Sequence, residues 1–392
     1  MNKLEKIDDL LSRGVAEIID SAHLRAAVNG KKKLRVKLGI DPTSPNIHIG
    51  RAVVLWKLRA FQELGHQVVF ICGDFTGLIG DTSDKESERP MLTESQVEAN
   101  MKSYFAQAGA IIDKSKAEMH YNSKWLKKLG FLEIGKMADA FGLHEFSSRE
   151  LIKKRMDAGK RVSLRELMYP LMQGYDSVAV KADVELGGTD QRFNLLAGRS
   201  IQPLYGQESQ DIMTFELLEG TDGRKMSSSW GNVINVVDSP ADMFGKVMSL
   251  RDELIERYFM LATHIPLATV RSLLQDIKNP RDQKLTLAQT LVEQYHSSKE
   301  ALMAKEAFIS QFSNKELPSD IEEIKIKSGA YQLVELLVQT KLAPSKGEAR
   351  RLIEQGGVKI NQKVIRADEK IELQKKNNLL LQVGKRKFIR II

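Results

Sequence analysis

The sequence predicts an α/β fold in which a Rossmann-like parallel-sheet domain is followed by a helical domain and a small α+β domain. Residues 34–40 alternate apolar and polar positions, which is the period of a β-strand. Residues 68–72 are continuously apolar, as expected for a strand buried on both faces of a parallel sheet. Between these strands, Val54, Leu58 and Phe61 recur at helical spacing. The three segments therefore predict a βαβ unit.

The chain begins with an amphipathic pattern in which Leu10, Leu11 and Val15 are apolar, and we expect a helix over residues 3–19. The N-terminus carries acidic residues and lacks the apolar core of a signal peptide, and no apolar run is long enough to span a bilayer. The single cysteine, Cys72, excludes intrachain disulfides and a multi-cysteine zinc site. We expect a cytoplasmic protein that does not contact a membrane.

Residues 41–51 lie where the first strand of the βαβ unit ends and its helix begins. The first turn of a helix leaves amide N–H groups unpaired, and the peptide dipoles add partial positive charge there. An anion therefore binds well at such a place. Gly50 allows a ligand to approach the backbone, and His48 adds a hydrogen-bond donor. Taken alone, the segment could equally be an ordinary loop with a surface histidine.

A second candidate phosphate site is the loop Lys225-Met-Ser-Ser-Ser, which follows Arg224. Its adjacent cations, hydroxyls and backbone amides suit a polyphosphate, although a serine-rich surface loop is the alternative. The two segments, about 175 residues apart, resemble the paired signatures of class I aminoacyl-tRNA synthetases, HIGH and KMSKS, which read HIGR and KMSSS here. The resemblance implies catalytic roles for Thr43, His48, Lys225 and Ser228. It implies ATP binding by Gly39, Asp41, His48, Gly50, Gly188, Asp190, Met226 and Ser228.

Residues 164–180 read as a helix that a Ser163–Glu166 capping box opens. Tyr169, Gln173 and Asp176 share one face of it, which suits a polar pocket wall better than a core, with a solvent-facing stripe as the alternative. The spacing resembles the Tyr-x-x-x-Gln-x-x-Asp pattern of tyrosyl-tRNA synthetases. By that resemblance, Tyr169 and Gln173 hold the ammonium end of the amino acid, and Asp176 accepts a hydrogen bond from its phenol.

Two glycine-containing loops complete the predicted site. The loop of residues 73–90 resembles the GLIGD segment of the same family, which implies that Asp81 binds the ammonium and that Lys85 and Arg89 move onto the pyrophosphate. Residues 183–191 form a strand, a glycine turn and a helix start. There the resemblance assigns Asp190 to the ribose and Gln191 to the substrate carboxylate. The predicted tyrosine-binding set is Lys37, Asp81, Tyr169, Gln173, Asp176 and Gln191.

We predict three domains, covering residues 1–232, 233–318 and 329–392. The first contains an insertion over about residues 94–160 that reads as mostly helical, with a capping box at Thr93–Gln96 and further caps at Ser123 and at residues 147–148. In the family that the chain resembles, the insertion lies at a subunit interface, which implies a homodimer. The helical domain of that family contacts the anticodon arm.

The last domain is basic. Residues 329–392 contain fourteen Lys or Arg against six Asp or Glu, whereas the preceding residues carry forty-five of each. A basic domain on a neutral body indicates a polyanionic partner. The segment resembles the RNA-binding domain named after the fourth ribosomal small-subunit protein. This implies that tRNA(Tyr) is the partner and that its phosphates meet Lys346, Arg350, Arg351 and Lys359, although a solvated basic face is the common alternative.

The resemblance to bacterial tyrosyl-tRNA synthetases implies that L-tyrosine and ATP react to tyrosyl-adenylate, with Mg²⁺ entering on ATP and neither a tightly bound cofactor nor a protein metal site. The tyrosyl group then moves to the 3′ end of the tRNA. Three residues depart from the family pattern. Arg51 replaces the second histidine of HIGH, Ser228 replaces the second lysine of KMSKS, and Lys37 stands where many relatives carry a tyrosine.

Three other classes of protein share parts of the pattern. A tryptophanyl-tRNA synthetase has both signatures but fits the Tyr169, Gln173 and Asp176 stripe and the basic tail badly. Another nucleotidylyltransferase would need neither the tail nor the KMSSS loop. A non-catalytic RNA-binding relative would not need His48 and Lys225.

Overall fold

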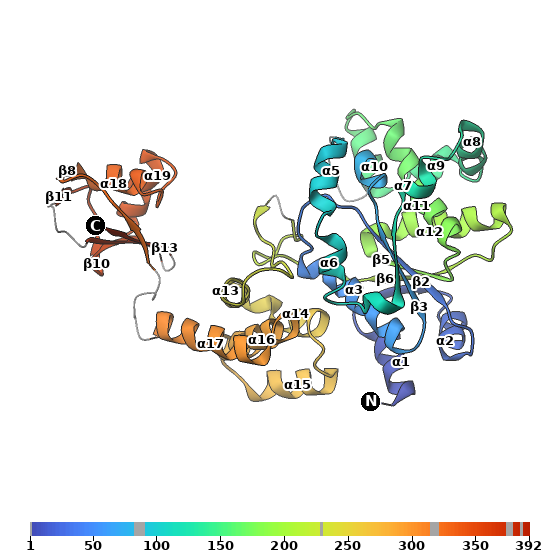
Figure 1. Cartoon of the computed structure of the whole chain (residues 1–392), viewed down its shortest axis with the longest axis horizontal. Coiled ribbons are helices and arrows are strands. Elements are labelled where there is room, and N and C mark those ends of the chain that lie inside the picture. Colours follow the sequence, from blue (N-terminus) through green and yellow to red (C-terminus); the bar gives the residue numbers. More distant parts are fainter. Residues whose placement is uncertain (1, 82–90, 228–229, 314–320, 374–378, 385–386) are drawn as a thin grey trace. The chain divides into compact units, whose positions relative to one another are not determined.

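The computed structural model describes residues 2–81, 91–227, 230–313, 321–373, 379–384 and 387–392 (Figure 1). The chain forms two compact units, Met1–Lys305 and Glu306–Ile392. Among the described residues, no helix has the length and apolar character that crossing a membrane requires. The proposed division near residue 232 lies inside the first unit and stays a prediction.

The first unit is built on a six-stranded sheet in the order β1-β6-β5-β2-β3-β4. All neighbours are parallel except β1 and β6, which are antiparallel. The chain runs outward from β2 through β3 to β4 and then returns to place β5 on the other side of β2. The ends of β2 and β5 are therefore a topological switch point, where open α/β sheets bind ligands. The strands are β1 (Val15–Ile19), β2 (Arg35–Ile40), β3 (Gln67–Cys72), β4 (Ala117–Tyr121), β5 (Val184–Gly188) and β6 (Asp211–Phe215).

Helices cover this sheet (Figure 1). The predicted βαβ unit is confirmed as β2, α3 and β3, and the buried strand β3 contains the free Cys72. The helices are α1 (Lys3–Ser12), α2 (Ser21–Asn29), α3 (Ile49–Glu63), α4 (Thr76–Ile79), α5 (Glu94–Met101), α6 (Tyr104–Ala108), α7 (Ser123–Leu126), α8 (Phe131–Asp139), α9 (Leu143–Ser147), α10 (Glu150–Asp157), α11 (Leu164–Val180), α12 (Arg192–Ile201), α13 (Pro240–Met248), α14 (Ile255–Ala262), α15 (Leu267–Asp276) and α16 (Pro280–Tyr295). Helix α17 (Ser298–Ser313) begins in the first unit and ends in the second.

The helix α11 lies where the sequence predicts it, and its polar stripe faces the switch point. The Ser163–Glu166 capping box is present, and so is the box at Thr93–Gln96 that opens α5. Pro170 lies inside α11. Behind the stripe, Val180 packs with Val69 and Ile71 of β3, so one face of the central strands is covered by α11.

The predicted helix over residues 3–19 is wrong in its second half. Helix α1 ends at Ser12, and Gly14 adopts a φ of +64°, in the left-handed region that favours glycine. The β-branched residues that follow form β1, which pairs with β6, a strand about 200 residues later in the chain. Pairing over such a sequence distance leaves no local pattern, and it overrides the helical spacing of the apolar positions.

The insertion over residues 94–160 is mostly helical, as predicted, and it also contributes β4 to the edge of the main sheet. Every residue of β4 is partly exposed, which explains why the segment shows neither an apolar run nor clear alternation. The predicted cap at Ser123 is wrong, whereas Ser148, from the pair predicted as a cap, is the C-cap of α9. Asn122 precedes α7 and Arg149 precedes α10, and neither helix has a side-chain cap hydrogen bond.

The second unit has its own core. Apolar residues of α18, α19 and the strands, among them Leu336, Ile353 and Leu381, are buried together. Its elements are β7 (Glu322–Ile324), β8 (Gly329–Gln332), α18 (Leu333–Gln339), α19 (Lys346–Glu354), β9 (Val358–Ile360), β10 (Lys363–Ile365), β11 (Lys370–Leu373), β12 (Leu379–Val383) and β13 (Lys387–Ile391). They form a five-stranded sheet, β10-β9-β12-β13-β7, and the pair β11-β8. A small α+β domain is what the sequence predicts.

Candidate active site

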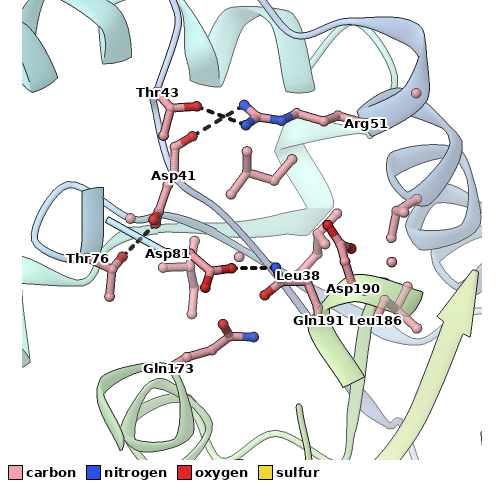
Figure 2. Close-up of a pocket in the computed structure, with 18 of the residues that line it drawn as sticks. Leu38, Asp41, Thr43, Arg51, Thr76, Asp81, Gln173, Leu186, Asp190 and Gln191 are labelled. Atoms are coloured by element: carbon pink, nitrogen blue, oxygen red, sulfur yellow. Dashed lines mark hydrogen bonds between the residues drawn. The ribbon is translucent and has the colours of Figure 1, made fainter. Parts of the chain in front are cut away.

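A pocket of about 340 Å³ lies at the switch point, between the ends of β2 and β5 and the polar stripe of α11 (Figure 2). Most of the residues that the sequence predicts for catalysis and substrate binding line it. These are Gly39, Asp41, Thr43, His48, Gly50, Asp81, Tyr169, Gln173, Asp176, Gly188, Asp190, Gln191, Lys225 and Met226. Lys85, Arg89 and Ser228 lie outside the described residues. Lys37 is described and does not line the pocket.

His48 is the N-cap of α3, and its ring is a hydrogen-bond donor toward the pocket. The amide of Arg51 donates to His48 Nδ1 at 3.3 Å, so the hydrogen of the neutral ring is on Nε2. Burial, with the nearby charges of Arg51 and Lys225, lowers the pKa of His48 from 6.5 to about 3. The imidazole is therefore neutral at physiological pH.

The two signature segments meet in space. The amide of Ile49 donates to the carbonyl of Ile234 at 2.8 Å, and the amide of Val236 donates to the carbonyl of Ile47 at 3.0 Å. A Cβ on Gly50 would lie 3.3 Å from the sulfur of Met226 and 3.1 Å from His48 Nδ1. Because Gly50 has no side chain, the loop that carries Lys225 and Met226 can pack against the start of α3.

The loop that carries Lys225 is held mainly by one buried side chain. Asn232 accepts from the amide of Ser227 at 2.9 Å and donates to Asp222 at 2.8 Å and to the carbonyl of Lys225 at 3.1 Å. Lys225 Nζ lies 3.0 Å from Asp190 Oδ2. The ammonium and the carboxylate that the sequence assigns to phosphate and ribose therefore contact each other in this structure.

Arg51 braces the loop that follows β2, a role that the sequence does not predict. Its guanidinium donates to Thr43 Oγ1 at 3.0 Å and to the carbonyl of Asp41 at 3.3 Å (Figure 2). It also donates to the Tyr104 hydroxyl at 3.0 Å. Because Thr43 Oγ1 accepts from Arg51, its hydroxyl hydrogen remains available to donate.

Asp41 connects the loop to α11. Its carboxylate accepts from Thr76 Oγ1 at 2.7 Å and from the Tyr169 hydroxyl at 2.8 Å. Burial raises the pKa of Asp41 from 3.8 to about 6, although these two hydrogen bonds act against the rise. A Cβ on Gly73 would lie 2.1 Å from Asp41 Oδ1, so only glycine leaves room for the carboxylate. Since Tyr169 donates its hydrogen to Asp41, its oxygen is left as an acceptor.

Asp176, the predicted phenol acceptor, is held by two side chains that the sequence analysis does not identify. Trp125 Nε1 donates to Asp176 Oδ1 at 2.7 Å, and Asn122 Nδ2 donates to Oδ2 at 3.2 Å. Burial raises the pKa of Asp176 from 3.8 to about 7, against the opposing effects of Lys37 and these bonds. Both partners come from the end of β4 and from α7. No sequence signal points to them, because β4 itself is not recognisable.

Three polar side chains converge at the other wall of the pocket. Figure 2 shows Asp81, Gln173 and Gln191 directed toward one another. Gln191 Nε2 donates to Asp81 Oδ2 at 2.6 Å, and Gln173 Nε2 donates to Glu185 Oε1 at 3.0 Å. Glu185 is a buried residue that the sequence analysis does not single out.

The predicted contact of Lys37 with the amino acid is not what the structure shows. Its side chain is fully buried, and its ammonium lies 2.9 Å from Glu185 Oε1. The same ammonium donates to the carbonyl of Gln173 at 2.9 Å and to Ser177 Oγ at 2.8 Å. Two hydrogen bonds and one ion pair thus hold the ammonium within the protein. These contacts, with Glu185 among them, hold Lys37 behind the pocket wall.

The predicted RNA-binding residues are all in the second unit. Lys346 and Arg350 are exposed on α19, one helical turn apart, and Arg351 is exposed beside them. Lys346 pairs with Glu335, and Arg351 pairs with Glu348. Lys359, on β9, is partly exposed. Exposed pairs of this kind exchange readily for contacts to phosphates.

Comparison with known proteins identifies the family. The family described as tRNA synthetases class I (W and Y) matches residues 29–313, and the tyrosine–tRNA ligase SYY-like C-terminal domain matches residues 313–391. The chain is 46% identical to a tyrosine–tRNA ligase of Moorella thermoacetica, over 97% of this chain and 94% of that protein. It is 45% identical to the enzyme of Thermotoga maritima, over 97% and 96% of the two chains.

Solved structures show the same fold. The tyrosyl-tRNA synthetase of Archaeoglobus fulgidus complexed with L-tyrosine matches with a TM-score of 0.62 and 24% identity, over 77% of this chain and all of that one. A truncated mitochondrial tyrosyl-tRNA synthetase of Aspergillus nidulans matches with a TM-score of 0.66 and 22% identity, over 78% and 94% of the two chains. The two family matches and the extent of the curated similarity show that this chain belongs to the bacterial tyrosyl-tRNA synthetases, ligases of the class I aminoacyl-tRNA synthetase family.

Proposed function

We propose that the pocket activates L-tyrosine with Mg²⁺-ATP, and that the tyrosyl group is then transferred to the 3′ end of tRNA(Tyr). The observation that carries this proposal is the arrangement of hydrogen-bond acceptors in the pocket. Asp176 offers a buried carboxylate to a phenolic hydroxyl. Asp81, Gln173 and the Tyr169 oxygen offer acceptors to an ammonium group, and both needs are met by tyrosine.

The buried acceptor also explains why tyrosine would be chosen over phenylalanine. The Asp176 carboxylate already accepts from Trp125 and Asn122, and the substrate hydroxyl would complete its hydrogen bonding. Phenylalanine would cover the carboxylate without a hydrogen bond, which costs the desolvation of a charged group. Tryptophan would bring an indole ring, whose polar N–H lies at a different place from a phenolic hydroxyl.

The other end of the pocket is proposed to bind ATP. The carboxylate of tyrosine attacks the α-phosphorus, the bond to pyrophosphate breaks, and tyrosyl-adenylate forms without a general base because the carboxylate is already ionised. Catalysis then consists of alignment and of donors that meet the charge developing on the phosphate oxygens. His48 Nε2 and Thr43 Oγ1 carry available hydrogens, and Lys225 supplies a cation. Asp190 would bind the ribose once Lys225 moves to the phosphates.

Lys85, Arg89 and Ser228 are proposed to contribute at the pyrophosphate by their place in the family's motifs. Gly39 and Gly188 would let the nucleotide approach the ends of β2 and β5, since no side chain stands there. Gln191, already bonded to Asp81, would contact the tyrosine carboxylate.

A homodimer and tRNA binding belong to the same proposal. Large apolar side chains are exposed on α8 to α11, and Phe131 is 93% exposed. The others are Leu132, Leu143, Met156, Leu164 and Met168. A second copy of the chain would cover them, and sedimentation of a Phe131→Glu variant as a monomer would support this. The basic residues of α19 and β9 would bind tRNA phosphates.

Amino-acid-dependent ATP–pyrophosphate exchange tests the activation step. With tyrosine, tryptophan and phenylalanine in parallel, we expect exchange with tyrosine alone. Exchange with tryptophan alone would contradict the assignment of Asp176, and exchange with none would contradict activation altogether. Charging of tRNA(Tyr) with labelled tyrosine tests the second step.

A further inference from the structure

A buried cluster of charged and polar side chains lies directly behind the pocket wall that Gln173 forms. Its centre is Glu185, which is 1% exposed, and its cation is Lys37, which is fully buried. A buried ion pair is costly to desolvate and is weak evidence for stability, so its position next to a substrate-binding side chain calls for an explanation.

Each contact of the Glu185 carboxylate within the described part of the chain comes from a donor. Oε1 receives Gln173 Nε2 at 3.0 Å and Lys37 Nζ at 2.9 Å. Oε2 receives Ser177 Oγ at 3.1 Å and Gln210 Nε2 at 2.5 Å. The carboxylate is thus surrounded by hydrogen-bond donors, and the Lys37 ammonium lies beside it as its cation.

This arrangement determines which end of the Gln173 amide faces the pocket. The amide nitrogen is bonded to a carboxylate, and rotating the amide by half a turn would bring its oxygen against that carboxylate. An oxygen facing an ionised oxygen is repelled, so the rotated form is excluded. Gln173 Oε1 is thus directed to the pocket, on the wall where Asp81 and Gln191 also lie (Figure 2).

We propose that Glu185, paired with Lys37, is a positioning residue that orients the Gln173 amide so that the pocket accepts, rather than repels, the ammonium group of its amino acid. An amide with its NH₂ toward the pocket would place two donors against a cation. The buried pair therefore determines recognition of the amino group and leaves recognition of the phenol to Asp176. This inference rests on the proposed use of tyrosine.

Two charge-neutral double variants separate orientation from simple structural support. The first, Lys37→Met/Glu185→Met, is called the methionine double variant and leaves no side-chain oxygen for Gln173 at position 185. The second, Lys37→Met/Glu185→Gln, is called the glutamine double variant and retains an amide oxygen at that place. Gln210 can rotate to accommodate the second variant, since its Oε1 has no hydrogen-bond partner among the residues that the structure describes. Both variants lack the buried charges, so they differ only in the group that faces the Gln173 amide.

The ligands are L-tyrosine, tyramine and 3-(4-hydroxyphenyl)propionate, whose Kd values are measured by calorimetry or by competition against tyrosine. Tyramine keeps the ammonium group, and the propionate lacks it. In the methionine double variant, we expect the Kd values for tyrosine and tyramine to rise about tenfold, because a hydrogen bond to a charged group is lost. The Kd for the propionate should rise less than about threefold. The glutamine double variant is expected to bind all three ligands within about threefold of wild type.

The proposal is overturned if the two double variants raise the Kd values of the ligands equally. It is also overturned if the methionine double variant raises the Kd values of all three ligands by the same factor. Arg13→Met serves as the stability control, since Arg13 is buried and bonds only carbonyls of residues 259–265 among its described contacts. It should lower Tm without discriminating between the ligands.

If the methionine double variant does not fold, Glu185→Asp takes its place. This variant retains the charge that Lys37 needs but shortens the side chain by one methylene, which draws the carboxylate away from Gln173. A loss of affinity confined to tyrosine and tyramine would support the proposal, and an equal loss for all three ligands relative to wild type would contradict it. Failure of the wild-type chain to bind tyrosine would instead contradict the proposed function.

Discussion

One lysine–carboxylate pair lies behind one end of the pocket and another lines the opposite end, and the two pairs differ in burial. Behind the amino-acid end, the side chains of Lys37 and Glu185 are 0% and 1% exposed. At the nucleotide end, the side chains of Lys225 and Asp190 are 38% and 22% exposed. A buried pair is held in one geometry by the bonds around it, whereas a partly exposed pair opens at little cost. By the roles proposed above, the amino-acid end is thus organised before substrate arrives, and the nucleotide end can rearrange around ATP.

The largest loss of activity is expected from Asp176→Asn, at the amino-acid end of the pocket. The new NH₂ group would face Trp125, Asn122 or the substrate hydroxyl, each of which is itself a donor. Two donors that face each other in a buried site cannot both form a hydrogen bond. We expect kcat/KM for tyrosine in pyrophosphate exchange to fall by about 10²- to 10³-fold. KM for ATP should stay near the wild-type value. A loss of less than about threefold would contradict the role of Asp176 as the phenol acceptor.

The next largest loss of activity is expected from Lys225→Met, at the nucleotide end of the pocket. Removing a cation that meets the phosphates should lower kcat of pyrophosphate exchange by about 100-fold. The free energy of unfolding should change by less than about 1 kcal/mol, because the pair with Asp190 is exposed. The Kd for tyrosine, measured without ATP, is the internal control. A larger loss of stability would show that the two ends do not differ in the way described.

The pH dependence of tyrosine binding sharpens the comparison. The ionised form of Asp176 is a much stronger acceptor for the phenol than the neutral acid, and burial raises the pKa of Asp176 to about 7. We expect the Kd for tyrosine to rise about tenfold between pH 8 and pH 6, while the affinity for ATP alone changes less. A flat profile for tyrosine over this range would contradict the assignment.

Stability should depend on pH in the opposite sense. Asp41 and Asp176 have folded-state pKa values of about 6 and about 7, above their ordinary value of 3.8. The folded chain therefore holds these protons more tightly than the unfolded chain. Their contribution to the free energy of unfolding is fully present below about pH 4 and is lost as pH rises through 6 and 7. Urea titrations of wild type and Asp176→Asn at several pH values would measure how much Asp176 contributes to the pH dependence of the free energy of unfolding.

The smallest effect is expected from Arg51→Met. The variant loses the guanidinium that braces Thr43 and the carbonyl of Asp41, so the phosphate-binding loop is less well held. We expect KM for ATP to rise about fivefold, with little change in the Kd for tyrosine. Arg51→Lys, which restores the charge but not the fork of donors, should recover only part of the loss. An equal effect on both substrates would mean that Arg51 supports the whole pocket.

Much of the fold and of the site follows from local sequence. The periodicities of residues 34–40 and 68–72 and the capping boxes at Thr93 and Ser163 are properties of neighbouring residues, and the structure confirms them. The stripe of Tyr169, Gln173 and Asp176 is likewise local, because a helix alone places these side chains on one face. Strand β1 and strand β4 are different, since each forms by pairing at an edge of the sheet and is only partly buried.

The sequence by itself determined the chemical groups of this protein and the elements that carry them. Only the tertiary structure decided which of those groups meet. The bond from Trp125 to Asp176 spans 51 residues, and that from Lys37 to Ser177 spans 140. A contact across such a distance depends on strand order and on packing between helix and sheet, which no local pattern records. For that reason Lys37, a pocket residue by motif, is a buried partner of Glu185 in the folded chain.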